Sequence, residues 1–223
     1  MRWLHRLRVW LGLPPEGRGV RGRARWVEAG ASPFGVEVLD CTPVTQEAVA
    51  MAVDAEAAER WLRLRRSDGR EHRGRSPQDA STTACRLSYE QPQRPPEGPV
   101  FKAEVMEDRW DVFHWDGRLH FVRSWSGTLV YRARVEWEDG RMHVAELEYP
   151  GGESPELAVR EVDFLVRSHL FDELAPHPLP PGGSEDPQEL AQASFARFGR
   201  RCRFGSFADT TRLPAIGDER FAG

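Results

Sequence analysis

The chain has 223 residues, of which 39% are hydrophobic, so it is long enough for one sizeable core, but it has no apolar stretch of about 18 residues that could span a membrane. Three widely separated cysteines, Cys41, Cys85 and Cys202, form no Cys-x-x-Cys pair, which argues against a disulfide scaffold or zinc site and favours a reducing cytoplasm. The formal charge is -4, and the acidic body of the chain argues against a large nucleic-acid-binding surface.

The N-terminal region is basic, since residues 1–25 contain seven arginines against the single Glu16, which leaves a charge of about -10 for the rest. Residues 2–11 place apolar side chains at helical spacing, and we expect a short amphipathic helix followed by a linker. A helix of about ten residues is marginal by itself, so its apolar face must rest on its own domain, on a partner protein or on a membrane surface. The apolar residues of this face are Trp3, Leu4, Leu7, Trp10 and Leu11.

Four elements are expected between this linker and the next Pro-rich break. Residues 34–41 alternate like a strand, and residues 54–66 have helical periodicity after Asp54, an N-capping residue type. Residues 67–83 show no periodicity and few apolar side chains, which indicates a mobile loop. Residues 85–90 are expected to form a second strand.

Residues 99–150 predict a β-meander. Asp116-Gly117, Ser126-Gly127 and Asp139-Gly140 separate strand-like runs that are rich in Val, Phe, Trp and Tyr, and Asp-Gly is among the strongest hairpin signals. Sequential hairpins give an antiparallel sheet. The five expected strands cover residues 100–106, 109–115, 118–125, 128–137 and 141–149.

Two helices are expected after the meander, and they complete the fold prediction. Ser154 caps a helix that extends to residue 171 and should pack on the sheet, and Asp186 begins a second helix that ends at Gly199. We therefore expect an α+β fold in which an antiparallel sheet of five to seven strands packs against helices. The expected divisions are the basic helix and linker (1–25), the sheet domain (26–175), and a linker with a C-terminal helical extension (176–223), which ends in irregular structure.

The hairpin register separates the residues of the meander into two faces. If every turn has two residues, Trp110 faces Arg123 and Trp125 faces Thr128. The mostly apolar face that carries Phe113 is then assigned to the core. The other face mixes aromatic and basic residues and is the candidate ligand-binding surface, with Trp110, His114, Arg123, Ser124, Trp125 and Arg132 as the candidate residues.

Trp110 and Arg123 carry the chemical argument for this surface. An arginine held against a tryptophan ring is positioned by a cation–π contact and still offers a planar fork of donors to a carboxylate or phosphate. This favours a small anionic or nucleotide-like ligand. The alternative is an ordinary cross-strand pair in which Arg123 bonds to an acidic neighbour such as Asp108 or Glu104.

The carboxylates around the first turn of the meander are the catalytic candidates. With Glu107-Asp108 as the turn, Glu104 faces Asp111, an arrangement that suits a general acid/base pair or a cation site. The alternative is a solvated turn. No histidine spacing defines a metal site, and no phosphate loop or dinucleotide fingerprint is present, so we expect no metal and no cofactor.

Residues 106–133, MEDRWDVFHWDGRLHFVRSWSGTLVYRA, resemble a signature of a family of uncharacterised bacterial proteins. The same motif is similar to one in a small module joined to some ADP-ribosylglycohydrolases. Ser126 stands where the signature more often has Thr, and the chain has no recognisable glycohydrolase domain. The resemblance implies a connection to ADP-ribose or NAD chemistry. The matching residues are Trp110, Arg123, Ser124, Trp125 and Gly127.

Three functions remain as hypotheses. The leading one is a non-enzymatic binding or interaction module that uses the aromatic-basic face for a protein partner or an anionic ligand. The second is an enzyme acting on a nucleotide or ADP-ribose-like substrate, with Arg123 holding phosphate and Glu104 or Asp111 as acid/base. The third is a membrane-peripheral protein anchored through residues 2–11.

Overall fold

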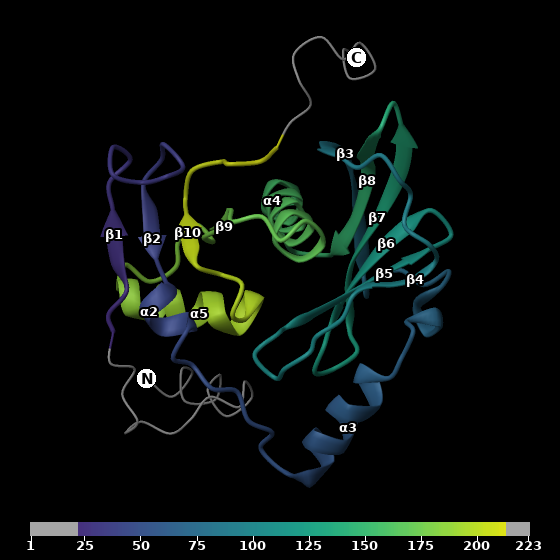
Figure 1. The fold of residues 1–223 in the computed structure, drawn as a ribbon, viewed down its shortest axis with the longest axis horizontal. Helices are drawn as coiled ribbons and strands as arrows, with labels where there is room; N and C mark the ends of the chain where they lie inside the picture. The colour runs from purple at the N-terminus through teal and green to yellow at the C-terminus, as the bar shows by residue number, and fades with distance from the viewer. Residues whose placement is uncertain (1–21, 213–223) are drawn as a thin grey trace.

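The computed structural model describes residues 22–212, which form two β-sheets with a helix between them (Figure 1). The amphipathic helix expected at residues 2–11 lies outside the described residues. The larger sheet is antiparallel throughout, and its six strands have the order β3-β8-β7-β6-β5-β4. This confirms an α+β fold with an antiparallel sheet of five to seven strands. The strands are β3 (Ala80–Glu90), β4 (Gly98–Phe101), β5 (Trp110–Trp115), β6 (Arg118–Arg123), β7 (Leu129–Glu138) and β8 (Arg141–Pro150).

The five strands from β4 to β8 are neighbours both in the chain and in the sheet, so the predicted meander is confirmed. Asp116-Gly117 and Asp139-Gly140 each make a two-residue turn, with φ of 52° and 68° in the first and 51° and 72° in the second. Positive φ at both central residues gives the turn type whose twist matches that of the flanking strands.

The smaller sheet joins strands from both ends of the described chain, in the order β1-β2-β10-β9. It pairs residues of the expected sheet domain with residues of the expected C-terminal extension. The prediction of irregular structure after Gly199 is wrong, because Phe204–Ser206 pairs with β2 on one side and β9 on the other. The strands are β1 (Arg25–Val27), β2 (Val38–Asp40), β9 (Pro176–Pro178) and β10 (Phe204–Ser206).

The three longer helices begin at the capping residues that the sequence indicates. Asp54 accepts a hydrogen bond from the backbone of Ala57, Ser154 from Leu157 and Asp186 from Gln188. Among the described helices, none is both long and apolar enough to cross a bilayer. The helical elements are α2 (Thr42–Thr45), α3 (Ala55–Arg65), a 3₁₀ turn (Arg70–His72), α4 (Pro155–Leu165), the π-helical turn that continues it (Val166–Leu170) and α5 (Pro187–Phe198).

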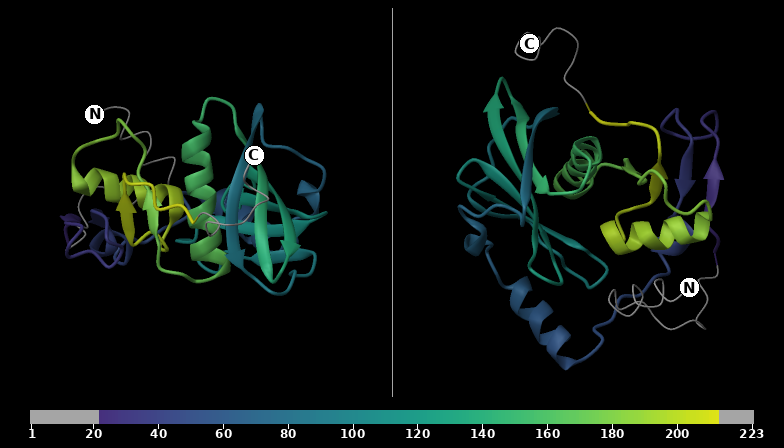
Figure 2. Two further views of the ribbon diagram at one scale, coloured as in Figure 1. Left: turned by 90° about the horizontal axis from the view of Figure 1, so that it is seen from above. Right: turned by 180° about the vertical axis from the view of Figure 1, so that it is seen from behind.

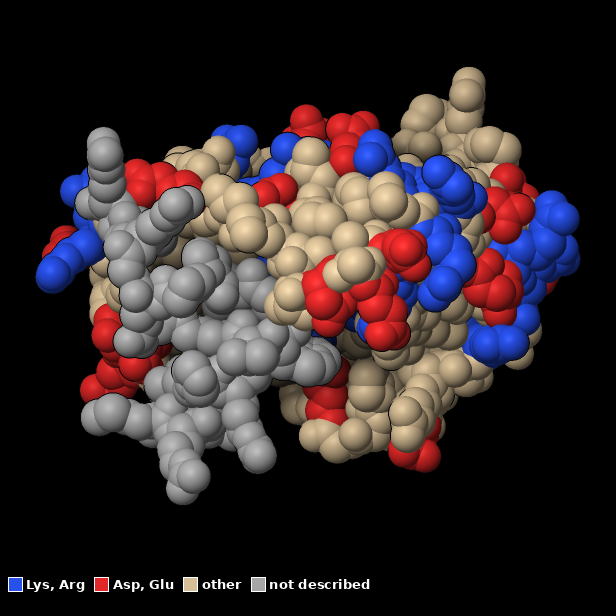
Figure 3. Space-filling view, turned by 90° about the horizontal axis from the view of Figure 1, so that it is seen from below, with Lys and Arg blue, Asp and Glu red and all other residues tan. Residues whose placement is uncertain are grey.

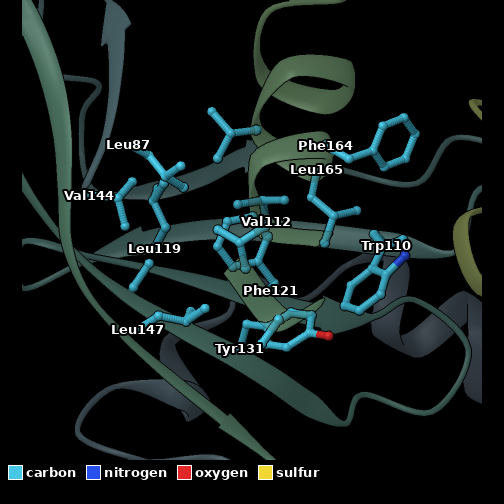
Figure 4. Close-up of a cluster of buried hydrophobic side chains, with 14 of the residues drawn as sticks. Leu87, Trp110, Val112, Leu119, Phe121, Tyr131, Val144, Leu147, Phe164 and Leu165 are labelled. Atoms are coloured by element: carbon cyan, nitrogen blue, oxygen red, sulfur yellow. The ribbon is translucent and has the colours of Figure 1, made fainter. Parts of the chain in front are cut away.

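The main core lies between the larger sheet and α4, which occupies the space between the two sheets (Figures 1 and 2). The C-terminal end of α5 completes it through Phe195 and Phe198. Full burial of each large apolar side chain contributes about 1.5–3 kcal/mol to folding. Figure 4 labels Leu87, Trp110, Val112, Leu119, Phe121, Tyr131, Val144, Leu147, Phe164 and Leu165 in this cluster.

On β5 and β6, the assignment of the two sheet faces is reversed relative to the prediction. The face that carries Trp110 is the main core, whereas Phe113 belongs to a smaller cluster on the other face. Residues 67–75 cover this second face: a Cβ on Gly69 would lie 2.2 Å from Cγ of Phe113, and Trp115 Nε1 donates to Asp68 O at 3.2 Å. The segment that was expected to be a mobile loop therefore packs on the sheet.

Candidate functional site

Trp110 and Arg123 form the cross-strand pair that the register predicts, with Arg123 Cζ 4.7 Å from the indole centroid. The expected open surface is absent at this pair, because Trp110 has no solvent exposure. The Arg123 guanidinium donates to the carbonyl oxygens of Ala196, at 2.9 Å, and of Arg197. Burial, together with the nearby Arg197 guanidinium, lowers the pKa of Arg123 to about 9, so the side chain stays protonated at neutral pH. Arg123 thus caps the C-terminus of α5, where carbonyls lack helical partners.

The turn after β6 differs from the predicted register. Arg123, and not Trp125, pairs with Thr128, since Arg123 N donates to Thr128 O at 2.9 Å. Gly127 N donates to Arg123 O at 2.8 Å and closes a four-residue loop. A bulge at Val122 then shifts β7 by one residue, which moves its side chains to the opposite faces.

Ser124 and Trp125 hold the loop that precedes β5. Ser124 Oγ donates to Asp108 O at 2.7 Å, and Trp125 Nε1 donates to Met106 O at 2.9 Å. Ser124 is buried and Trp125 is half-buried. The polar atoms that were expected to contact a ligand therefore contact the chain's own backbone.

His114 and Arg132 lie on opposite faces of the sheet. His114 is fully buried, with Nδ1 3.3 Å from Pro96 O, and burial lowers its pKa. Arg132 donates to Glu148 on β8 and, at 2.8 Å, to Arg75 O. The prediction that both residues share the Trp110 face is wrong for Arg132, because of the shift in β7.

Glu104 and Asp111 do not face each other across a two-residue turn. The sheet pairing of β4 ends at Phe101, and Asp111 accepts hydrogen bonds from Lys102 Nζ at 2.7 Å and from Ala103 N at 2.8 Å. Burial raises the pKa of Asp111, an effect that Lys102 opposes. Glu104 is exposed. The structure therefore does not place these carboxylates as an acid/base pair.

A polar cluster, which the sequence did not predict, connects α4, α5 and β7; Tyr131 and Glu161 are buried, and Glu153 and Arg197 are half-buried. Tyr131 Oη lies 2.8 Å from a carboxylate oxygen of Glu153 and of Glu161, and Arg197 donates to Glu161 at 2.8 Å and to Tyr131 Oη at 2.7 Å. A phenol has one proton, so it can donate to only one carboxylate at a time. Burial and the charge of Glu161 raise the pKa of Glu153. The sequence pattern of a single helix or strand cannot indicate this cluster, because its members come together only in the tertiary structure.

Arg109 is buried without a carboxylate partner. The residue is 3% exposed, and neither Nε nor Nη2 has a hydrogen-bond partner. Its guanidinium lies between two rings, 5.4 Å from the centroid of Trp125 and 5.2 Å from that of Phe195. Burial lowers the pKa of Arg109 to about 10. The turn that was considered as a solvated alternative is therefore packed at Asp108 and Arg109, although Glu104 is exposed.

Two cavities of about 310 Å³ each share Arg200 and Arg201, and we call the two together the arginine groove. The first cavity is otherwise lined by Val100, Phe101, Lys102, Glu104 and Asp108. The second is otherwise lined by Gln46, Ser168, Asp172, Glu173, Leu174 and Arg203.

The chain reversal at the end of α5 places these arginines. Gly199 has φ of 77°, and a Cβ there would lie 2.1 Å from Glu107 O, so this close approach requires glycine. Arg200 Nε then donates to the buried Asp108 at 2.7 Å, and Arg201 lies over the Phe101 ring with its guanidinium carbon 4.8 Å from the centroid.

Sequence reasoning missed the arginine groove. The signal was the group of Arg200, Arg201 and Arg203 directly after a helix-stopping glycine. Arginine accounts for all but one of the chain's 31 lysines and arginines, so a short arginine run does not stand out.

Neither a metal centre nor a disulfide is present in residues 22–212. No group of three or more His, Cys, Asp or Glu side chains in this range could hold a metal ion, and all three cysteines are free and buried. Comparison of the chain with models of protein families, with curated proteins and with solved structures gave no match.

Proposed function

We propose that the protein is a non-enzymatic binding module that takes a small anionic ligand in the arginine groove. The observation that carries this proposal is that the two cavities share Arg200 and Arg201, one of which stacks on Phe101. This is the aromatic-basic chemistry that the sequence suggested for Trp110 and Arg123, at a different place in the fold.

The arginines of the groove keep donors for a ligand. Arg200 pairs with Asp108, but its side chain is 42% exposed. Arg201 pairs with Asp172, whose side chain is 90% exposed, and such surface ion pairs contribute only about 0–1 kcal/mol. A ligand carboxylate or phosphate can therefore replace Asp172. Arg203 is exposed and, within the described residues, has no ion-pair partner.

The size and lining of the groove narrow the class of ligand. Each cavity is near the lower end of the range for small-molecule sites, about 300–1,000 Å³. The planar guanidinium of Arg201 suits bidentate contact with a carboxylate or phosphate. The resemblance to a module joined to ADP-ribosylglycohydrolases makes ADP-ribose the first probe, with AMP and inorganic phosphate as its fragments.

The test is calorimetric titration of the full chain with ADP-ribose, AMP and inorganic phosphate. Binding of at least one probe is expected, and Arg203→Ala should weaken it about tenfold, as one charge-assisted hydrogen bond is lost. Arg66→Ala removes an exposed arginine on α3's C-terminal side and is the matched control, with unchanged affinity expected. No binding at millimolar concentration, or equal affinity of both variants, would refute the proposal. If chromatography shows that the protein converts ADP-ribose or AMP to a product, the result would favour the enzymatic alternative.

A further inference from the structure

The segment that connects α2 to α3 exposes an apolar strip formed by Val49, Met51 and Val53, which are 56%, 65% and 62% exposed. The intervening Ala50 is 5% exposed, and its backbone N donates to Glu107 Oε1 at 2.9 Å. The alternation turns the larger side chains outward on one side of the segment. The segment is therefore fixed to the body of the protein while its apolar side stays uncovered by residues 22–212.

This strip is the densest exposed apolar feature of the described chain. The described chain has six exposed large hydrophobic residues, and three of them lie within residues 49–53. The other three, Leu62, Leu174 and Phe207, are far apart in the sequence. Single exposed apolar residues are normal, but a contiguous group of them indicates a contact surface.

We propose that the apolar face of residues 2–11 docks on the strip of Val49, Met51 and Val53. This inference is independent of the ligand proposed for the arginine groove. The two partners match in length, because a ten-residue helix is about 15 Å long and the strip, in extended conformation, is about 13 Å long. Docking also gives the predicted short helix the surface that it needs for stability.

The start of the described chain is close enough for this docking. Gly22 lies against α2, where a Cβ on Gly22 would be 2.3 Å from Cβ of Pro43. The six residue-to-residue steps from Pro43 to Val49 span at most about 20 Å. Residues 12–21 span up to about 33 Å when extended, so they can connect Gly22 to a helix on the strip.

The charges of the two segments are complementary. Residues 42–59 contain four carboxylates, Glu47, Asp54, Glu56 and Glu59, and no lysine or arginine. Residues 1–21 contain five arginines and one glutamate, a net charge of +4. Figure 3 views the molecule from below, the side of Figure 1 on which α3 lies, and shows acidic and basic side chains around uncharged surface. Opposite charges beside an apolar contact favour this pairing and fix its orientation.

Cysteine cross-linking in the full chain tests the proposal. In the variant Leu7→Cys, Met51→Cys, mild oxidation should give a disulfide within one molecule, at a rate independent of protein concentration. The native cysteines are buried, so they add little background. The control variant is Leu7→Cys, Thr82→Cys, which places the second thiol at an exposed position of β3, far from α2 in Figure 1. Its cross-linking should be at least tenfold slower.

The same experiment distinguishes docking of residues 2–11 on the strip from two alternatives, a second copy of the chain on the strip and a membrane surface that binds residues 2–11. Cross-linked dimers that increase with concentration would show that a second copy covers the strip, and would overturn the proposal. Loss of cross-linking on addition of phosphatidylglycerol vesicles, with co-sedimentation of the protein, would assign residues 2–11 to the membrane instead. Equal rates in the two cysteine variants would also refute docking.

Hydrogen exchange gives a measurement without new cysteines. In Trp3→Ser, Trp10→Ser, the amides of residues 46–54 should exchange at least fivefold faster than in the unaltered chain, while those of β5 and β6 stay unchanged. Unchanged exchange at residues 46–54 would contradict the proposal.

Discussion

Trp110 and Arg123 both donate to the same acceptor, the carbonyl oxygen of Arg197 at the C-terminus of α5. The two residues face each other across the β5–β6 hairpin, and the guanidinium lies over the indole ring. The last carbonyls of a helix have no helical donor, so this pair satisfies a buried acceptor while it packs sheet against helix. The most distinctive residues of the sequence signature therefore join α5 to the meander.

This joint predicts a large loss of stability in Arg123→Met. The substitution removes charged donors from two carbonyls in the core, and we expect the free energy of unfolding to fall by about 2–4 kcal/mol. Urea denaturation followed by far-UV circular dichroism measures this loss. A change below about 1 kcal/mol would show that the carbonyls find other partners.

Arg109→Met is the matched comparison for Arg123→Met, and we expect it to cause no loss of stability. Arg109 also lies against aromatic rings, but its Nε and Nη2 have no acceptor. Replacing an unpaired buried charge by an apolar side chain of similar length should leave the free energy of unfolding unchanged or raise it by about 1–2 kcal/mol. An equal loss in both variants would mean that the two arginines stabilise through packing alone.

The β5–β6 register could be predicted from the sequence, and the β6–β7 register could not. Asp116-Gly117 supplies two residues that tolerate positive φ, which specifies a two-residue turn. The next turn offers only Gly127, and its length depends on the hydrogen bond to Arg123 O. The bulge at Val122 adds a further shift that leaves no mark in the pattern of apolar residues.

The sequence pattern of single strands also could not predict which face of the sheet forms the main core. β5 is apolar on both sides, since Trp110 and Val112 alternate with Phe113 and Trp115, and all four are buried. Which face becomes the main core depends on where α4 and α5 pack, a long-range relationship. The helix starts at Asp54, Ser154 and Asp186 were predictable because capping is local. The arginine groove was not, since it joins Phe101 to Arg201 across a hundred residues.

Ser124 and Ser126, two serines of the loop after β6, should differ in their contribution to stability. Ser124 Oγ is buried and donates to Asp108 O, whereas Ser126 is exposed and contacts Thr128 Oγ1. Ser124→Ala should lower the free energy of unfolding by about 1–2 kcal/mol, because it leaves a buried carbonyl unpaired, and Ser126→Ala by less than about 0.5 kcal/mol. Urea midpoints of the two variants decide this, and equal midpoints would contradict the structural role assigned to Ser124.

Buried neutral histidines predict a loss of stability in acid, and His177 is the best placed to show it. His177 is fully buried, its Nε2 lies 2.7 Å from Ser194 Oγ, and burial lowers its pKa to about 3. The unfolded chain, with an imidazole pKa near 6.5, binds a proton that the folded protein excludes. The stabilising effect of the neutral ring is therefore complete above about pH 6.5 and is lost as the pH falls towards 3.

We accordingly expect the unaltered protein to lose about 2 kcal/mol more stability than His177→Asn between pH 7 and pH 5, at about 1.4 kcal/mol per pH unit below 6.5. Urea denaturation of both proteins at several pH values measures the difference, in which the contributions of the other titrating groups cancel. Phe164→Leu alters a ring packed against His177 without removing the imidazole, so its stability should run parallel to that of the unaltered protein as the pH changes. If His177→Asn also runs parallel, the imidazole must be protonated inside the folded protein, and its pKa is not lowered.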